Sequence, residues 1–307
     1  MLAVKNLTDT KTTFSRDARL MGTGFDFKLV TDNPAWALER IEEAIAEISR
    51  IEKLLSTFNE DSSISQINRN AGVAPVRVDA ETYRLIDRAL QISTLTYGTF
   101  DIAYGIPQNE EDGGVAVATK TKSLKKKISL TNYTNIVLNE TKQTVFLKNK
   151  AMRISLSAIG RGYAADRAKV VLQMQGVSSG VIIFGSDMLT WGLQPGNTPW
   201  TIGAADAGKV GEVYSQMDIS NMALSTSYNA APINSNMQIN NATGFPVSAI
   251  KSVSILAPTA EMAGAMTAPM FSMGINTALY MVNKLNQIAC VVIDDHERVY
   301  TSKHIQL

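Results

Sequence analysis

The stretch from residue 155 to residue 187 constrains the fold more than any other part of this sequence. It reads SLSAIGRGYAADRAKVVLQMQGVSSGVIIFGSD, in which two serines and a Gly-Arg-Gly turn precede an expected helix at Tyr163–Gln175. Gly176 is the expected end of that helix, and the apolar run Val181–Phe184 predicts a buried strand. The strand ends at Gly-Ser-Asp, which is either a tight turn or a place for a ligand.

The rest of the chain mixes helical and strand patterns without a regular βαβ repeat. Alternating apolar residues predict a strand at Leu20–Val30, and Asn33-Pro34 predicts a helix start. One apolar helix face is formed by Ile41, Ile45, Ile48, Ile51 and Leu55. The other expected elements are a helix at Ala80–Thr96 capped by Asp79, a final helix at Glu261–Met273, and strands at Thr134–Leu138, Thr144–Leu147, Arg153–Leu156, Trp200–Ile202, Val253–Leu256 and Ala289–Ile293. This mixture predicts an α+β fold with mixed or antiparallel sheets rather than a doubly wound sheet.

The chain has 307 residues, and no linker rich in Pro, Gly or Ser divides it. We therefore expect a single domain over residues 1–307, within which two intimate α+β halves are possible. Residues 106–127 are expected to form an exposed insertion, and the basic run Lys120–Lys127 within it is interpreted as solvated.

Composition excludes several classes of function. The formal net charge of +1 argues against a dominant nucleic-acid partner. No apolar stretch is long enough for a membrane span, and the N-terminal residues do not resemble a signal peptide. Cys290 is the only cysteine and lies in an apolar strand, so it is expected in the core. His296 and His304 lie outside any metal-ligand pattern and are expected at the surface.

Two motifs carry candidate chemistry. The glycines at 160 and 162 would let a phosphate approach a helix N-terminus, with Arg161 as a cation and Ser155 as a hydroxyl donor. The alternative is a plain strand-to-helix turn. Asp101, in GTFDIAYG, is either a hydrogen-bond acceptor for a ligand or a turn carboxylate that caps local backbone. Asp166 is better explained as a partner of the helix dipole than as a catalyst.

The order of the motifs is more informative than any one of them. Eight motifs follow one another from Met21 to about Gly274. In order, they are MGTGFDF, ISRIEKLLSTFNEDSSISQINRNAG, TYGTFDIAYG, ISLSAIGRGYAAD, GVIIFGSDMLTWG, LSTSYN, INNATGFPV and SVSILAPTAEMAGAMTAPMFSMG. This succession resembles the flavin transferases, the FAD:protein FMN transferase (ApbE-like) family.

The resemblance implies an α+β fold that binds FAD in a long cleft. It also implies an enzyme that uses Mg²⁺ to break the pyrophosphate and moves FMN onto a Thr or Ser of an acceptor protein. The positions that match FAD contacts of the family are Met21, Phe58, Thr99, Phe100, Asp101 and Arg161. Ser155 stands where the family carries Asp, and Ile239 lies in the loop near the substrate. Phe58 matches an aromatic that stacks on the flavin.

The sequence departs from the family pattern at the catalytic positions. The family histidine corresponds to Met237, whose thioether cannot carry a proton at neutral pH, and Asn240 and Asn241 replace Asp and Pro. The two side-chain metal ligands correspond to Gly264 and Ala268.

The metal position that remains is Ala158, which offers only a backbone carbonyl. Thr267 is out of register by one residue, while Glu261 lies on the same helix face as Gly264 and is the candidate substitute ligand. Three interpretations follow: an active transferase with unusual ligands, a non-catalytic flavin-binding or regulatory relative, and a scaffold that no longer binds FAD.

Overall fold

The computed structural model describes residues 12–105, 132–205, 213–228 and 250–303. The chain divides into two compact units, a first unit of residues 1–49 and 161–307 and a second unit of residues 50–160. The expected insertion at 106–127, with its basic run, lies outside the described residues, as does His304. In the described part, no helix is both long and apolar enough to cross a membrane.

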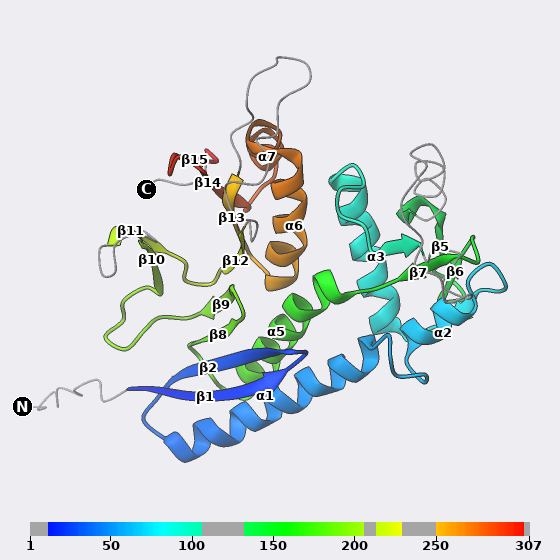
Figure 1. Cartoon of the computed structure of the whole chain (residues 1–307). Coiled ribbons are helices and arrows are strands. Elements are labelled where there is room, and N and C mark those ends of the chain that lie inside the picture. Colours follow the sequence, from blue (N-terminus) through cyan, green and yellow to red (C-terminus); the bar gives the residue numbers. More distant parts are fainter. Residues whose placement is uncertain (1–11, 106–131, 206–212, 229–249, 304–307) are drawn as a thin grey trace, which may run out of the picture. The chain divides into compact units, whose positions relative to one another are not determined.

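The first unit is built on an eight-stranded antiparallel sheet (Figure 1). Its strands, in spatial order, are β1 (Thr12–Leu20), β2 (Thr23–Thr31), β8 (Gly180–Phe184), β9 (Asp187–Trp191), β12 (Ala223–Tyr228), β13 (Ile250–Ala257), β14 (Ala289–Asp294) and β15 (Val299–Thr301). A separate hairpin pairs β10 (Thr201–Ala205) with β11 (Val213–Asp218). The predicted α+β class with antiparallel sheets is confirmed.

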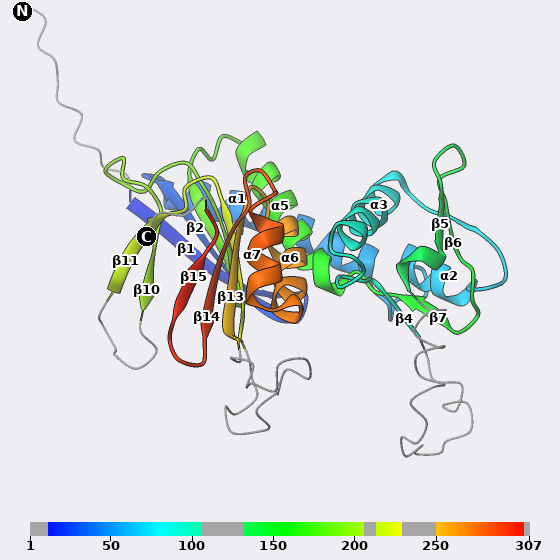
Figure 2. The ribbon, with the colours of Figure 1, turned by 90° about the horizontal axis from the view of Figure 1, so that it is seen from above.

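Helices cover one face of this sheet, and the β10–β11 hairpin lies on the other (Figure 2). The helices are α1 (Pro34–Leu55), α5 (Ser157–Met174), α6 (Ala260–Met273) and α7 (Ile275–Val282). Side chains alternate accordingly along β12 and β13. Leu224 and Leu256 pack with Trp200 and Met217 of the hairpin, whereas Val253 and Ile255 are fully buried on the opposite side.

The second unit contains α2 (Ser63–Arg69), α3 (Ala80–Leu95), a three-stranded sheet and a two-stranded sheet. The three-stranded sheet has the order β3 (Val76–Arg77), β6 (Thr144–Leu147) and β5 (Ile136–Asn139), with a 3₁₀ turn at Tyr133–Asn135 before β5. The two-stranded sheet pairs β4 (Ala103–Gly105) with β7 (Met152–Ile154).

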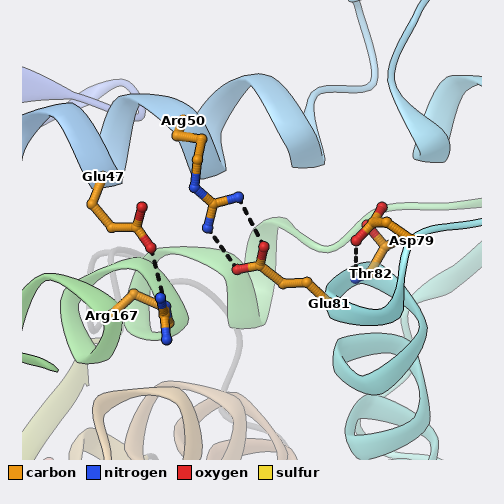
Figure 3. A network of polar contacts seen from close by, with 6 residues as sticks. All are labelled: Glu47, Arg50, Asp79, Glu81, Thr82 and Arg167. Carbon is orange, nitrogen blue, oxygen red and sulfur yellow. Dashed lines mark hydrogen bonds and ion pairs between the residues drawn. The ribbon is translucent and has the colours of Figure 1, made fainter. Parts of the chain in front are cut away.

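Ion pairs and a helix cap fix the helices inside each unit (Figure 3). In the second unit, the Arg50 guanidinium of α1 binds both carboxylate oxygens of Glu81 on α3 at 2.8 Å, and Asp79 caps α3 by accepting the Thr82 N–H at 2.8 Å. In the first unit, Arg167 Nε of α5 lies 3.1 Å from Glu47 Oε1 of α1. The predicted Asp79 cap is therefore confirmed.

The structure differs from the sequence prediction at the start of two elements. The strand predicted at Leu20–Val30 is confirmed as β2 from Thr23 on, but its start is wrong, because Leu20 ends β1 and Met21 and Gly22 form the turn between β1 and β2 with φ of 49° and 76°. The predicted Gly-Arg-Gly turn is helix, since α5 begins at Ser157 and contains residues 160 to 162. The helix that was expected to be final, at Glu261–Met273, is followed by α7.

The reason that glycine occurs inside α5 is a close approach of two helices of the first unit. A Cβ built on Gly162 would lie 2.3 Å from the Ala260 carbonyl oxygen at the start of α6. Four residues later, the Asp166 carboxylate accepts the N–H groups of Ala260 at 2.9 Å and Glu261 at 2.8 Å. The prediction that Asp166 partners the dipole of its own helix is therefore wrong, because α5 begins nine residues earlier and the carboxylate serves the N-terminus of α6 instead.

Candidate functional site

The second unit contains a cavity of about 530 Å³ beside the end of α1. It is lined by residues that include Phe58, Ser65, Asn68, Arg69, Tyr104 and Arg153. The Phe58 ring is 95% exposed. The chain turns just after α1 because the Ser56 hydroxyl accepts the N–H groups of Phe58 at 3.2 Å and Asn59 at 3.0 Å. An aromatic face is therefore presented to a cavity that also contains two guanidinium groups.

Asn68 fixes one wall of this cavity. Its amide is buried and forms two hydrogen bonds with the backbone of Ile154 on β7, donating to the carbonyl at 2.9 Å and accepting the N–H at 2.8 Å. On the same strand pair, Tyr104 of β4 lies opposite Arg153 of β7. Arg153 Nη1 donates to the carbonyl oxygens of Lys150 and Met152, which orients its side chain.

The predicted Thr99-Phe100-Asp101 contact motif has three different environments. Thr99 is exposed, whereas Phe100 is only 4% exposed and its N–H donates to the Thr96 hydroxyl. The Asp101 carboxylate accepts the N–H groups of Ala103 at 2.8 Å and Tyr133 at 2.9 Å. Burial raises the pKa of Asp101, and these two hydrogen bonds lower it. The alternative of a turn carboxylate is thus the one that the geometry favours.

Met21 occupies a turn position that normally takes Asn or Gly. Because both turn residues, Met21 and Gly22, have positive φ, the hairpin requires the left-handed conformation that a long side chain disfavours. Such strain often marks a functional position, so the turn is consistent with the ligand contact implied for Met21.

Residues at the start of α5 differ in exposure. The Ser155 hydroxyl lies 3.1 Å from the Ser157 hydroxyl and accepts the Ser157 N–H at 3.3 Å, so it serves the first turn of the helix. Ala158 and Arg161 are exposed. Ser155 and Ala158 belong to the second unit and Arg161 to the first.

Asp187 in the first unit lies within a group of hydroxyl donors. It opens β9 after the Gly-Ser turn, and it receives hydrogen bonds from the Ser225 hydroxyl and the Thr226 N–H of β12. Burial raises its pKa, whereas these hydrogen bonds and the charge of Arg161 lower it. The Gly-Ser-Asp turn is recognisable in the sequence but its partners are not, because they lie on a strand nearly forty residues further along the chain.

Comparison with known proteins shows which family this chain belongs to. The model of the ApbE family matches residues 21–292. The chain belongs to the ApbE family.

Its ApbE relatives cover nearly the whole chain. The FAD:protein FMN transferase of Treponema pallidum is 25% identical over 95% of this chain and 87% of that protein. The Escherichia coli K12 protein of the same name is 23% identical over 87% of this chain and 80% of that protein.

Solved ApbE structures share the fold. The flavin transferase ApbE from Vibrio cholerae has a TM-score of 0.78 at 20% identity and covers 95% of this chain and 98% of that one. The ApbE protein of Thermotoga maritima has a TM-score of 0.75 at 23% identity, with 95% and 97% coverage.

The residues implied as metal positions do not fit a magnesium ion. On α6, Gly264 is half-buried and Ala268 is exposed, and neither carries a side-chain oxygen. Thr267 is 1% exposed and donates its hydroxyl to the Ala263 carbonyl at 2.6 Å, so it faces away from that side, as its register predicts. Glu261 is also buried, at 9% exposure. Among the described residues, no group of three His, Cys, Asp or Glu side chains could hold a metal ion.

The remaining residues named from the sequence lie in the core, at the surface or outside the described residues. Cys290 is fully buried, as expected, and burial raises its pKa to about 12. His296 has an exposed side chain. Met237, Ile239, Asn240 and Asn241 lie outside the described residues.

Proposed function

We propose that this ApbE-family protein binds FAD. The observation that carries the proposal is the exposed Phe58 ring at a cavity of about 530 Å³. A cavity of this size is typical of small-molecule sites, which combine apolar or aromatic walls with a few oriented polar groups. Here Tyr104 adds a second aromatic, and Arg153 adds donors suited to ring carbonyl oxygens. The name shared by its relatives, FAD:protein FMN transferase, specifies the ligand.

Replacing Phe58 by alanine should weaken FAD binding by about tenfold, since stacking on an aromatic ring contributes about 1–3 kcal/mol. Because the ring is exposed, folding should be unaffected. Titration of the protein into FAD, followed by flavin fluorescence, measures the change. Tyr280→Ala is the matched control, since Tyr280 is also an exposed aromatic but lies on α7 in the first unit. Equal affinities of Phe58→Ala and the wild type would contradict a site at this ring.

The chain's own residues support binding better than transfer. FMN transfer forms a bond between the acceptor hydroxyl oxygen and the FMN phosphorus and breaks the pyrophosphate bond to release AMP. It needs a base for the hydroxyl proton and positive charge at the phosphates. Arg161 supplies a permanent positive charge. The Met237 thioether cannot take the proton, and α6 offers no side-chain oxygen for a metal at Gly264 or Ala268. We therefore propose a non-catalytic flavin-binding or regulatory protein.

FMN transfer to a Thr or Ser of an acceptor protein is the second candidate, and the family match over residues 21–292 favours it. Incubation with FAD, Mg²⁺ and an acceptor domain, followed by mass spectrometry of the acceptor, separates the two. We expect no added FMN and no AMP with the wild type. The combined variant Gly264→Asp, Ala268→Thr and Met237→His should gain activity. An acceptor that the wild-type protein flavinylates would establish the second candidate instead.

A further inference from the structure

The Asn68 amide takes the place of a third strand beside β7. Strand β4 pairs with β7 along one edge, and Asn68 of α2 lies at the other. It accepts the Ile154 N–H at 2.8 Å and donates to the Ile154 carbonyl at 2.9 Å, as a paired residue does in an antiparallel ladder. Asn68 is only 8% exposed, so little water competes for these hydrogen bonds. The backbone of β7 is therefore held along both edges.

The alternation of side chains along β7 determines where Arg153 points. The Ile154 side chain is fully buried, so the neighbouring Arg153 side chain lies on the opposite face of the strand. Tyr104 lies opposite Arg153 on β4, and both residues line the cavity of about 530 Å³ together with Phe58. A shift of β7 by one residue would exchange its two faces. By anchoring Ile154, Asn68 therefore keeps Arg153 at the cavity.

The two guanidinium groups of this cavity have different partners. Arg69 forms an ion pair with Glu60, with 3.5 Å between Arg69 Nη1 and Glu60 Oε2. Arg153 Nη1 donates to the carbonyl oxygens of Lys150 and Met152 at 2.7 and 2.8 Å. Among the described residues no carboxylate forms an ion pair with Arg153, and its guanidinium has further donors beyond Nη1. These donors, and the positive charge, are available to a ligand in the cavity.

We infer that Asn68 is a positioning residue of the flavin site. By holding β7, it keeps the Arg153 guanidinium where it donates to the carbonyl oxygens of the flavin ring, while Phe58 stacks on the ring face. The inference rests on the proposed function, because it assigns a role in FAD binding, and it involves residues of the second unit only. Hydrogen bonds to carbonyl oxygens depend on the direction of the donor, whereas stacking requires only a flat face. Loss of the Asn68 amide should therefore weaken recognition of the carbonyl oxygens and leave stacking intact.

The experiment compares Asn68→Ala, Arg153→Met and the double variant, with FAD, lumiflavin and phenazine as ligands. Lumiflavin is the flavin ring without the ribityl and phosphate groups, so it reports on the ring site alone. Phenazine is a fused aromatic of similar shape that lacks carbonyl oxygens, so it reports on stacking. Flavin fluorescence measures the binding of FAD and lumiflavin, and displacement of lumiflavin measures the binding of phenazine.

Arg153→Met should weaken the binding of lumiflavin and FAD by about tenfold, because a charge-assisted hydrogen bond is lost. Asn68→Ala should weaken both by about three- to tenfold and should cause no further loss in the Arg153→Met background. Phenazine should bind all variants equally. Asn70→Ala is one control, since the Asn70 amide also donates to a backbone carbonyl, that of Gln66 at 2.9 Å, but does not line the cavity. Arg77→Met is the other, because Arg77 is an exposed cation on β3.

Folding of the Asn68 variants is checked by urea denaturation. Asn68 lines the cavity, so water can bind the Ile154 backbone in Asn68→Ala, and we expect this variant to fold. If it does not, Asn68→Ser replaces it, because its hydroxyl still offers a hydrogen-bonding group to that backbone.

The other outcomes overturn the inference. Equal weakening of phenazine and lumiflavin by Asn68→Ala would show that Asn68 acts on the whole site. A further loss in the double variant would show that it acts without Arg153, and unchanged affinities would show that it has no role in binding. Binding of FAD without binding of lumiflavin would place the ring outside this cavity. A wild type that bound neither FAD nor lumiflavin would contradict the proposed function itself, which differs from a wild type that binds both no better than Asn68→Ala does.

Discussion

Gly162→Ala should destabilise the first unit by about 3 kcal/mol or more, although alanine is the better helix former. The new methyl group would lie 2.3 Å from the Ala260 carbonyl oxygen, 2.5 Å from its carbonyl carbon and 2.7 Å from the Glu261 nitrogen. These are backbone atoms at the start of α6, so no side-chain rotation relieves the overlap. Helix α5 or α6 has to shift, and the hydrogen bonds of Asp166 to α6 weaken with it.

Urea denaturation followed by tryptophan fluorescence measures this effect, because Trp36, Trp191 and Trp200 all lie in the first unit. Gly24→Ala is the matched control, since a Cβ there meets no atom within 4 Å. We expect its denaturation midpoint to change little. Hydrogen exchange in α6 gives a second measure if the variant stays folded, and faster exchange is expected there. A Gly162→Ala protein as stable as the wild type would contradict the close approach.

Gly162 also explains why the sequence predicts a turn where the structure has the first turns of α5. Gly-Arg-Gly is a poor helix sequence by local propensity, and a turn is the ordinary interpretation. The contact that requires glycine comes from Ala260, almost a hundred residues away, and no local pattern contains it. Long-range packing therefore overrides propensity at the start of α5.

Elements with strong local signals were predictable. The Asp79 cap, the Ala80–Leu95 helix and the Thr144–Leu147 strand all lie where the sequence places them. In contrast, α2 lies in a polar stretch, rich in Ser and Asn, where the sequence predicts no helix. Its stability comes from the buried Ile64 and Ile67 and from the hydrogen bonds of Asn68 to β7, which are tertiary interactions.

In the candidate site too, the contacts between residues far apart in the sequence could not be predicted. Phe58 was named only because it matches a position of the family, and the structure adds that a local turn after α1 accompanies its exposure. The environment of Asp101 could not be predicted, because one of its two donors is the Tyr133 N–H, which lies beyond the expected insertion. The cavity residue Arg153 was missed for a related reason, since strand pairing with β4 brings it beside Tyr104.

As pH rises from about 4 to 7, the free energy of unfolding of the wild type should fall relative to that of the Asp166→Asn variant. Burial raises the pKa of Asp166 to about 6 from an ordinary 3.8, and the N–H groups of Glu261 and Ala260 oppose this shift. The Glu261 carboxylate raises the pKa and Lys169 lowers it. In this pH window the folded state binds more protons than the unfolded chain. The free energy of unfolding therefore falls with increasing pH, by about 3 kcal/mol for a shift of about two units.

The asparagine variant is neutral throughout, so this pH dependence should vanish in it. Urea denaturation of both proteins at several pH values between 4 and 8 gives the difference directly. Asp17→Asn serves as the control for a general charge effect, because Asp17 is exposed on β1. If instead the wild type gained stability relative to Asp166→Asn as pH rose, the two hydrogen bonds to α6 would outweigh burial. The ionised carboxylate would then be the form that the start of α6 requires.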